Sequence, residues 1–234
     1  MSGLACLPMY DWPETRGQVD AFHARLRAMV PELPVALTRP GDDAALHAVW
    51  RDPALMFGQS CWGPLNAGLA AHVVILGQPL YDDVPGGQGT RYRSAIVMRE
   101  GRACPAPGSS CACLPDGLAT LRAAVNAPES LSGCLALSED MQTPLVAPVV
   151  TGSHRASIRA VAEGRADFAA IDCRSWAMAL VHEPAARQLT VTGWTALRPG
   201  LPFITSIATL PGIRGRLTQA LATLGAIPAP EVPA

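Results

Sequence analysis

The chain has 234 residues, of which 49% are apolar and 16% are charged, and its formal net charge is −1. This composition predicts a globular protein with buried cores and excludes a largely disordered chain. A near-neutral chain without a basic cluster is not expected to bind nucleic acid. The chain contains no lysine, which excludes Schiff-base chemistry and a P-loop lysine.

The length exceeds the roughly 150 residues of a usual domain, so we expect two lobes. No apolar run approaches the roughly 18 residues that cross a bilayer, and no membrane span is expected. The first ten residues lack the pattern of a signal peptide. As written, the sequence therefore predicts a cytoplasmic protein, and a periplasmic one if a signal has been removed. Seven cysteines, an odd number, are typical of reduced cytosolic thiols.

The first part of the chain alternates between apolar, strand-like runs and helical patterns, which is typical of parallel α/β architecture. In chain order we expect a strand at residues 4–9, a helix at 14–29, strands at 35–37 and 54–57, a helix at 64–71, a strand at 73–76, a glycine-rich turn at 85–89 and an extended segment at 91–99. The first crossing between lobes is expected near the last of these.

The second part opens with residues 101–117, whose Pro, Gly, Ser and Cys content predicts an irregular surface excursion. Strands are then expected at residues 121–126, 146–151, 168–172 and 189–193, with helices from Ser132, at 154–163 and at 174–181. Residues 201–207 carry the chain back, a final helix at 212–224 packs on the first lobe, and 228–234 form a loose tail.

A candidate anion site lies where the strand at 121–126 runs into Pro128-Glu129-Ser130-Leu131-Ser132-Gly133. Ser130 and Ser132 stand where a helix N-cap belongs, so their hydroxyls and the first free helix amides converge on one point. Such a point attracts anions. The alternative is that Ser132 merely caps its own helix.

A second strand-to-helix junction follows at Thr151-Gly152-Ser153-His154-Arg155. His154 in the first turn could donate a hydrogen bond to an oxyanion, and the alternative is an ordinary polar surface residue. Asp172 ends the strand at 168–172, on the edge where open α/β sheets bind ligands. An ionised Asp172 accepts hydrogen bonds, so it favours hydrogen phosphate, a phosphonate or an aminophosphonate over sulfate.

These segments resemble a known family. Gly152-Ser153-His154-Arg155-Ala156-Ser157, Gly164-Arg165-Ala166-Asp167 with Ala170-Ile171-Asp172, Gly193-Trp194 and Pro199-Gly200-Leu201-Pro202-Phe203 are similar to the phosphate/phosphonate-type substrate-binding proteins of ABC transporters. The segment Pro128 to Gly133, the loop Phe57-Gly58-Gln59-Ser60-Cys61 and Tyr92-Arg93-Ser94 fall in the family's order, and together the similarity covers most of the chain.

The resemblance implies an α/β, two-lobed type II periplasmic-binding-protein-like fold with two hinge crossovers. We place lobe I at residues 1–95 and 198–234 and lobe II at 96–197. The chain is then expected to hold a small phosphorus oxyanion in the interlobe cleft without catalysing a reaction on it. Family contacts carry over to Ser130, Ser132, His154 and Asp172, and Leu131 replaces a hydroxyl residue of the family pattern. The full set of predicted ligand contacts is Tyr10, Ser60, Cys61, Tyr92, Arg93, Ser130, Ser132, Gly133, Ser153, His154 and Asp172.

The expected partner is a small anionic ligand, with an ABC permease as a further candidate, and the chain is expected to be a monomer or a weak dimer. No cofactor or metal is expected, because the Cys111-Ala112-Cys113 spacing with Cys104 lacks the pattern of common zinc sites, and oxidation or surface exposure explains these thiols better. Two other classes stay open: a cytosolic ligand-sensing protein of the same fold, and a cleft enzyme, for which Cys61 would need a histidine base such as His72 or His154.

Overall fold

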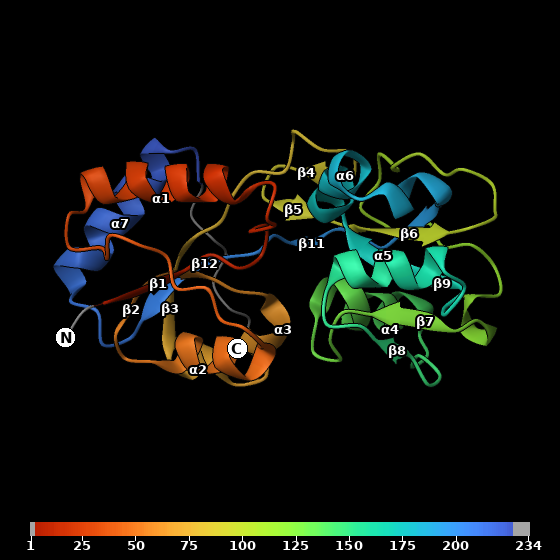
Figure 1. The fold of residues 1–234 in the computed structure, drawn as a ribbon, viewed down its shortest axis with the longest axis horizontal. Coiled ribbons are helices and arrows are strands. Elements are labelled where there is room, and N and C mark those ends of the chain that lie inside the picture. The colour runs from red at the N-terminus through yellow and green to blue at the C-terminus, as the bar shows by residue number, and fades with distance from the viewer. Residues whose placement is uncertain (1–2, 227–234) are drawn as a thin grey trace. The chain divides into compact units, whose positions relative to one another are not determined.

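The computed structural model describes residues 3–226, which form two compact units (Figure 1). The first unit comprises residues up to Leu80 and from Leu201 onward, and the second comprises Tyr81–Gly200. The chain therefore passes between the units twice, near residue 80 and near residue 200. The outward passage comes earlier in the chain than the expected 95/96 boundary, because residues 87–98 form strands that pair within the second unit.

The first unit is built on a four-stranded sheet with the order β1-β2-β12-β3. β1 (Leu4–Cys6) runs parallel to β2 (Leu55–Gln59), whereas β12 (Phe203–Ser206) lies antiparallel between β2 and β3 (Val73–Gly77). The helices of this unit are α1 (Arg16–Met29), α2 (Asp43–Arg51), α3 (Trp62–Asn66) and α7 (Pro211–Thr223), with a 3-10 turn at Leu69–Ala71. The strand that returns from the second unit is thus inserted into the middle of the first sheet.

The core of the first unit lies where α1 and α7 pack together beside the sheet (Figure 1). Phe203 of β12 stacks on Phe22 and on Phe57, with ring centroids 5.7 Å and 5.5 Å away. Leu26 and Leu217 are fully buried against these rings. Each such side chain contributes about 1.5–3 kcal/mol by burial, which is why the final helix packs on this unit as predicted.

The second unit carries a five-stranded sheet with the order β10-β6-β9-β7-β8. β7 (Ala123–Val125) is parallel to both β8 (Val149–Val150) and β9 (Phe168–Asp172), while β6 (Ser94–Met98) is antiparallel to β9 and to β10 (Thr190–Trp194). A smaller sheet joins β4 (Gly87–Gln88), β5 (Arg91–Tyr92) and β11 (Arg198–Pro199). The helices are a π-helical turn at Leu131–Leu135 that continues as α4 (Ala136–Met141), α5 (His154–Ala162) and α6 (Cys173–His182), with 3-10 turns at Leu118–Thr120 and Pro184–Gln188. The four-stranded and five-stranded sheets are mixed rather than purely parallel, and the small sheet is antiparallel.

Most elements lie where the sequence predicts them, with two clear exceptions. The predicted strand at residues 35–37 is wrong: the segment forms bends, and Val35 is 79% exposed. Helix α2 was not predicted, although Asp42 caps it by accepting a hydrogen bond from the amide of Ala45 at 2.8 Å. The predicted tail at 228–234 lies outside the described residues. Within residues 3–226, none of the helices is both long and apolar enough to cross a bilayer.

Candidate functional site

The candidate site lies at one edge of the five-stranded sheet. β7, β8 and β9 are parallel neighbours, so their carboxyl ends meet at the same edge. Asn126 follows β7, His154 follows β8 by a short turn, and Asp172 ends β9. This is the edge at which open α/β sheets bind ligands. Three polar side chains from distant parts of the sequence are therefore brought together by strand direction alone.

The helical segment after β7 separates the roles of its two serines. Ser130 is the N-cap, and its hydroxyl oxygen accepts a hydrogen bond from the amide of Gly133 at 3.2 Å. Ser132 is the second residue of the helical turn and does not serve as that cap. Its carbonyl oxygen accepts a hydrogen bond from the hydroxyl of Ser94 at 2.9 Å, which ties the turn to β6. The alternative that Ser132 merely caps its own helix is therefore wrong, and Ser130 has that role.

Ser132, His154 and Asp172 form one contiguous polar cluster. The Ser132 Oγ atom lies 3.0 Å from His154 Nε2, and the same nitrogen lies 3.4 Å from Asp172 Oδ2. Ser132 and Asp172 are buried, and Asp172 is only 3% exposed. The other carboxylate oxygen of Asp172 accepts the amides of Arg174 and Ser175, at 3.1 Å and 3.0 Å, as the N-cap of α6. Capping fixes the carboxylate, and the carboxylate faces the imidazole.

The histidine of this cluster is held neutral. Burial lowers the pKa of His154 below its ordinary value of 6.5, and the attraction of Asp172 offsets this only in part. The Nδ1 atom of His154 is buried and has no hydrogen-bond partner within residues 3–226. An unpartnered buried nitrogen is expensive, by about 1–3 kcal/mol. A ligand atom that pairs with Nδ1 would remove this penalty.

Asn126 and Gly133 complete the surroundings of His154. The carbonyl oxygen of Asn126 accepts the amide of Gly152 at 3.0 Å, which extends the pairing of β7 with β8 by one residue. The side-chain Oδ1 atom of Asn126 is buried without a partner in the described part of the chain. Gly133 sits so close to this oxygen and to His154 that a side chain at this position would have to displace the side chain of Asn126. Sequence reasoning missed Asn126 and Ser94; the position of Asn126 at a strand's carboxyl end was the available signal.

Of the other predicted contacts in the second unit, Ser153 has a local role. Its hydroxyl accepts the amide of Ala156 at 3.1 Å, as the N-cap of α5. This cap starts the helix that carries His154 in its first turn, where backbone amides have no acceptor within the helix. Ser153 therefore positions His154.

Arg93 and Tyr92 lie on the short link between β5 and β6. Arg93 is 3% exposed, and its Nη2 atom donates to the carbonyl oxygen of Ser109 at 2.6 Å. Its Nη1 atom is buried without a hydrogen-bond partner, and none of the carboxylates in residues 3–226 pairs with it. Burial lowers the pKa of this guanidinium. Tyr92 is buried and stacks on Tyr81 with ring centroids 5.3 Å apart, so its ring serves packing.

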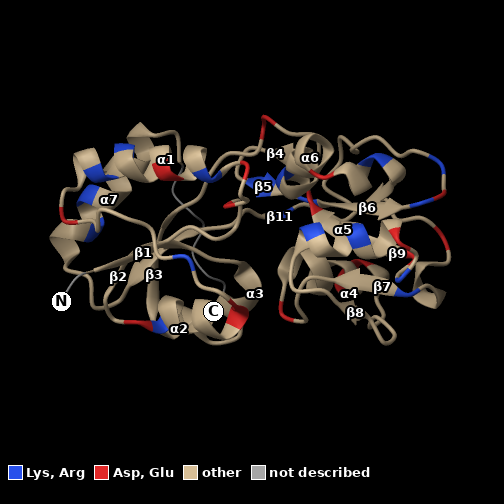
Figure 2. Ribbon diagram, viewed as in Figure 1, with Lys and Arg blue, Asp and Glu red and all other residues tan. Residues whose placement is uncertain are grey.

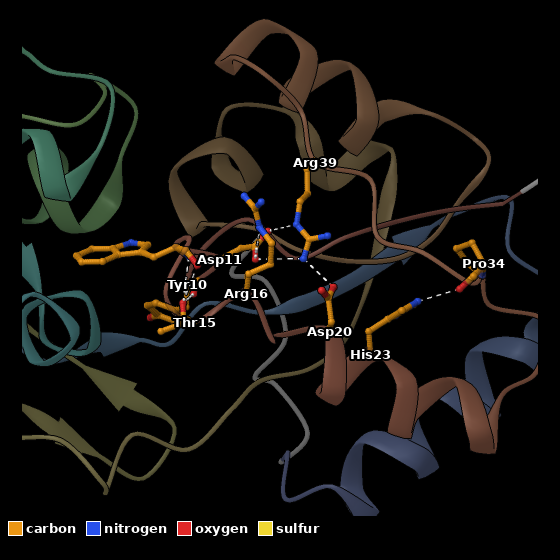
Figure 3. A network of polar contacts seen from close by, with 9 residues as sticks. Tyr10, Asp11, Thr15, Arg16, Asp20, His23, Pro34 and Arg39 are labelled. Atoms are coloured by element: carbon orange, nitrogen blue, oxygen red, sulfur yellow. Dashed lines mark hydrogen bonds and ion pairs between the residues drawn. The ribbon is translucent and has the colours of Figure 1, made fainter. Parts of the chain in front are cut away.

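The predicted contacts Tyr10, Ser60 and Cys61 belong to the first unit. The carbonyl oxygen of Tyr10 accepts the hydroxyl of Thr15 at 2.8 Å, in the turn that precedes α1 (Figure 3). Ser60 is fully buried between β2 and α3, and Cys61 is the N-cap residue of α3. Each of these side chains follows or lies near the end of a strand.

The turn at Tyr10 is braced by a charged network (Figure 3). Arg39 donates to Asp11 at 2.6 Å and to Asp20 at 2.7 Å, and Arg16 lies 3.9 Å from Asp11. These contacts raise the pKa of Arg39, chiefly through the hydrogen bonds to Asp11 and Asp20. The network fixes the path of the chain between β1 and α1.

The charged residues of the described part of the chain do not form one large surface patch of a single sign (Figure 2). In Figure 2, acidic and basic residues are interspersed over the helices of both units. Among the described residues, no three or more His, Cys, Asp or Glu side chains are grouped so that they could hold a metal ion.

The fold and this cluster define the class of protein: an α/β solute-binding protein of the type II periplasmic-binding fold. A family model described as "ABC transporter, phosphonate, periplasmic substrate-binding protein" matches residues 63–231. The chain belongs to this family, whose members bind a solute for transport. A comparison with curated proteins found no match.

Solved structures show the same fold. PhnD1 from Prochlorococcus marinus, solved in complex with methylphosphonate, has a TM-score of 0.71 at 15% identity, with 94% of this chain and 83% of that chain covered. A binding protein component of an ABC phosphonate transporter from Pseudomonas aeruginosa has a TM-score of 0.66 at 17% identity, with coverage of 95% and 79%. The periplasmic VFT2 domain of BvgS from Bordetella pertussis has a TM-score of 0.63 at 14% identity, with coverage of 95% and 88%.

Proposed function

We propose that the cluster of Ser132, His154 and Asp172 binds a small phosphorus oxyanion, such as a phosphonate, phosphate or phosphite. The observation that carries this proposal is the placement of Ser132 Oγ and Asp172 Oδ2 on the same imidazole nitrogen, at 3.0 Å and 3.4 Å, at the sheet edge where three parallel strands end. Family membership and the methylphosphonate complex of PhnD1 support the choice of ligand.

Each member of the cluster has a distinct role in this proposal. The Ser132 hydroxyl donates to an unprotonated oxygen of the ligand. With Nε2 of the neutral imidazole facing Ser132 and Asp172 as a donor, Nδ1 of His154, which has no partner among the described residues, accepts from a protonated oxygen of the ligand. Asp172 accepts from a protonated oxygen or from a ligand ammonium group. Charge-assisted hydrogen bonds contribute about 1.5–3 kcal/mol each, so three or four of them are compatible with micromolar affinity, about −8 kcal/mol.

The same geometry argues against a serine hydrolase. In a Ser-His-Asp triad the carboxylate orients one imidazole nitrogen and the serine uses the other. Here Ser132 and Asp172 both face Nε2 of His154, and Nδ1 has no partner among the described residues. The family is one of transport binding proteins. We therefore propose that the chain binds its ligand without turnover.

We further propose that the chain delivers its ligand to an ABC permease, works in the periplasm as its family does, and acts as a monomer or weak dimer. Ligand sensing is the second candidate, because a solved histidine kinase sensor domain with similarity to periplasmic binding proteins shares the fold. The two functions differ in their partner. A permease that copurifies supports transport, whereas a soluble signalling protein that copurifies supports sensing.

A thermal-shift panel tests the ligand class. Phosphate, phosphite, methylphosphonate and aminoethylphosphonate should raise the melting temperature, whereas sulfate and taurine should not, because ligands that bind only the folded state stabilise it. A protein that responds to sulfate as strongly as to methylphosphonate would contradict the proposed role of Asp172. A protein that responds to none of the phosphorus oxyanions would contradict the proposed ligand class.

Substitutions test the residues. Ser132→Ala and His154→Ala should each weaken the affinity for the stabilising oxyanion by more than tenfold. Ser110→Ala and His72→Ala, both at exposed positions, are the matched controls and should leave the titration unchanged. Unaltered affinity in both cluster variants would remove these residues from the site. The same titration tests the other predicted contacts. Alanine substitutions there show which side chains contribute to the affinity for the oxyanion: Tyr10, Ser60, Cys61, Tyr92 and Arg93.

A further inference from the structure

Two thiols of the irregular excursion lie in contact. Cys104 Sγ and Cys113 Sγ are 3.5 Å apart, and both thiols are free. The sequence alone does not indicate this pairing, because eight residues of Pro-, Gly- and Ser-rich chain lie between the two cysteines. A disulfide needs the two sulfur atoms at about 2.05 Å, so only a small approach is required.

The backbones of both residues are fixed independently by the edge strand β10. The amide of Cys104 donates to the carbonyl oxygen of Val191 at 2.8 Å, and the indole Nε1 of Trp194 donates to the carbonyl oxygen of Cys104 at 2.9 Å. Cys113 and Trp194 exchange both backbone hydrogen bonds, at 2.8 Å and 2.7 Å, as an antiparallel bridge. The same strand therefore holds each thiol beside the other.

We propose that Cys104 and Cys113 form an intramolecular disulfide when the protein meets a disulfide oxidant, such as glutathione disulfide or the disulfide of a thiol oxidase. The thiolate of one cysteine attacks the oxidant's disulfide, which forms a mixed disulfide and releases one small thiol. The second thiolate then attacks the protein sulfur of that mixed disulfide and releases the second thiol. In sum, two protein thiols and one oxidant disulfide give one protein disulfide and two small thiols.

The surroundings assign the order of the two attacks. Cys113 is exposed, whereas Cys104 is half-buried. Burial raises the pKa of Cys104, and the hydrogen bond and charge of Cys113 raise it further. Cys113 is therefore the first nucleophile and Cys104 the resolving thiol. An open cavity of about 550 Å³, to whose lining Cys104 contributes, gives solvent access to this part of the excursion.

Four of the other five thiols are poorly placed to compete. Cys6 and Cys173 are buried, which raises the pKa of each to about 12. Cys61 is also buried, and Cys134 is half-buried. Cys111 is exposed and lies two residues from Cys113, so it provides the strictest internal control.

The disulfide would close a covalent ring of residues 104–113. This ring contains Ser109, which accepts a hydrogen bond from the buried Arg93. Within the segment between the two cysteines, the carbonyl oxygen of Ser109 accepts Arg93 Nη2, and the carbonyl oxygen of Ser110 accepts the amide of Leu197 at 2.9 Å. Closing the ring restricts this segment in the unfolded chain and holds it on the second unit. The oxidised protein is therefore expected to melt roughly 5 °C higher than the reduced protein.

Thiol counting and peptide mapping test the proposal on the full chain. After incubation with glutathione disulfide and removal of the excess, the denatured protein should contain at most five free thiols instead of seven, because the crosslink consumes two thiols and the exposed Cys111 can carry a glutathione besides. Non-reducing peptide mapping should then find one crosslink, between Cys104 and Cys113. Cys111→Ser should behave like the parent chain. Cys104→Ser should lose the crosslink and keep glutathione attached at Cys113, and Cys113→Ser should also lose the crosslink.

Several results would overturn the assignment. A crosslink that maps to Cys111, a bond between two chains, or seven free thiols after incubation would each do so. Reductant should lower the melting temperature of the oxidised parent and of Cys111→Ser, but not that of Cys104→Ser or Cys113→Ser. The assay requires no ligand, so its failure would leave the proposed oxyanion site untouched.

Discussion

Gly133 and the side chain of Asn126 interlock: a Cβ atom placed on Gly133 would lie 1.8 Å from Asn126 Oδ1 and 3.3 Å from His154 Cε1. The side chain of Asn126 therefore occupies the place of the missing methyl group. At this point the first helical turn of the site closely approaches the end of β7 and the imidazole of His154.

Gly133→Ala should displace the Asn126 side chain and weaken oxyanion affinity by more than tenfold, with a loss of about 1 kcal/mol in the free energy of unfolding. The loss of stability should shrink in the Asn126→Ala background, because the obstructing atom is gone; a double-mutant cycle by urea denaturation measures this. Gly215→Ala, at an open position in α7, is the control and should be neutral or stabilising. Additive effects at 126 and 133 would contradict the interlock.

Acidification should destabilise the protein through His154. Its folded pKa is lowered below the ordinary 6.5, so between these two values the unfolded chain binds more protons than the folded chain. Stability is therefore fully present above pH 6.5 and falls below it, by at most about 1.4 kcal/mol per pH unit. Melting temperatures between pH 5 and 8 measure the slope. His154→Gln should flatten it more than His72→Gln does, and equal slopes in the two variants would refute the assignment.

Two substitutions separate the capping role of Asp172 from the effect of its negative charge. Asp172→Asn keeps an oxygen acceptor for the amides of Arg174 and Ser175, whereas Asp172→Ala loses the cap and about 1 kcal/mol of stability. Removing the negative charge should also relax ligand selection, because a fully deprotonated anion no longer meets a carboxylate. Sulfate should therefore stabilise Asp172→Asn more than it stabilises the parent. A variant that still ignores sulfate would show that the charge does not select the ligand.

Glu183 secures the helix that carries His154. Its Oε2 atom lies 2.8 Å from Arg155 Nε and 2.7 Å from an Arg159 nitrogen, both on α5. Burial alone would raise the pKa of Glu183, but the hydrogen bonds from Arg155 and Arg159 lower it overall. The stabilisation is thus present above the ordinary carboxylate pKa and is lost as pH falls through the lowered value.

Glu183→Gln should destabilise the protein by about 1–3 kcal/mol at neutral pH, measured by urea denaturation, because two arginines lose a largely buried partner. The exposed pair of Arg165 and Glu163 is the matched control, and Glu163→Gln should change stability by less than about 0.5 kcal/mol. Equal effects of the two substitutions would contradict a structural role of Glu183.

The meeting of Ser132, His154 and Asp172 could be predicted because it depends on strand direction. Once three segments are recognised as parallel strands, their carboxyl ends must share an edge. The division of labour between Ser130 and Ser132 could not be predicted, since it depends on a π-helical first turn that rotates one hydroxyl toward the amide of Gly133 and the other toward His154.

Other features depend on contacts between distant segments. The partner of Arg93 is a carbonyl oxygen of the irregular excursion, and the pairing of Cys104 with Cys113 is set by β10, far along the chain. Local patterns carry no information about such contacts. Helix α2 differs, because its Asp42 cap was visible in the sequence. The strand expected at residues 35–37 failed because a short apolar run next to Pro34 found no sheet partner.

The attachment of the excursion to β10 also shields one flank of the five-stranded sheet. β10 is the outermost strand, and an uncovered outermost strand invites pairing with another chain. Here Cys104 and Cys113 form hydrogen bonds with the backbone groups of Val191 and Trp194. Gly193 has no side chain, which lets residues 113–115 approach the strand closely. Removing residues 104–113 would expose these groups and should make the protein self-associate, even with Ser132, His154 and Asp172 intact.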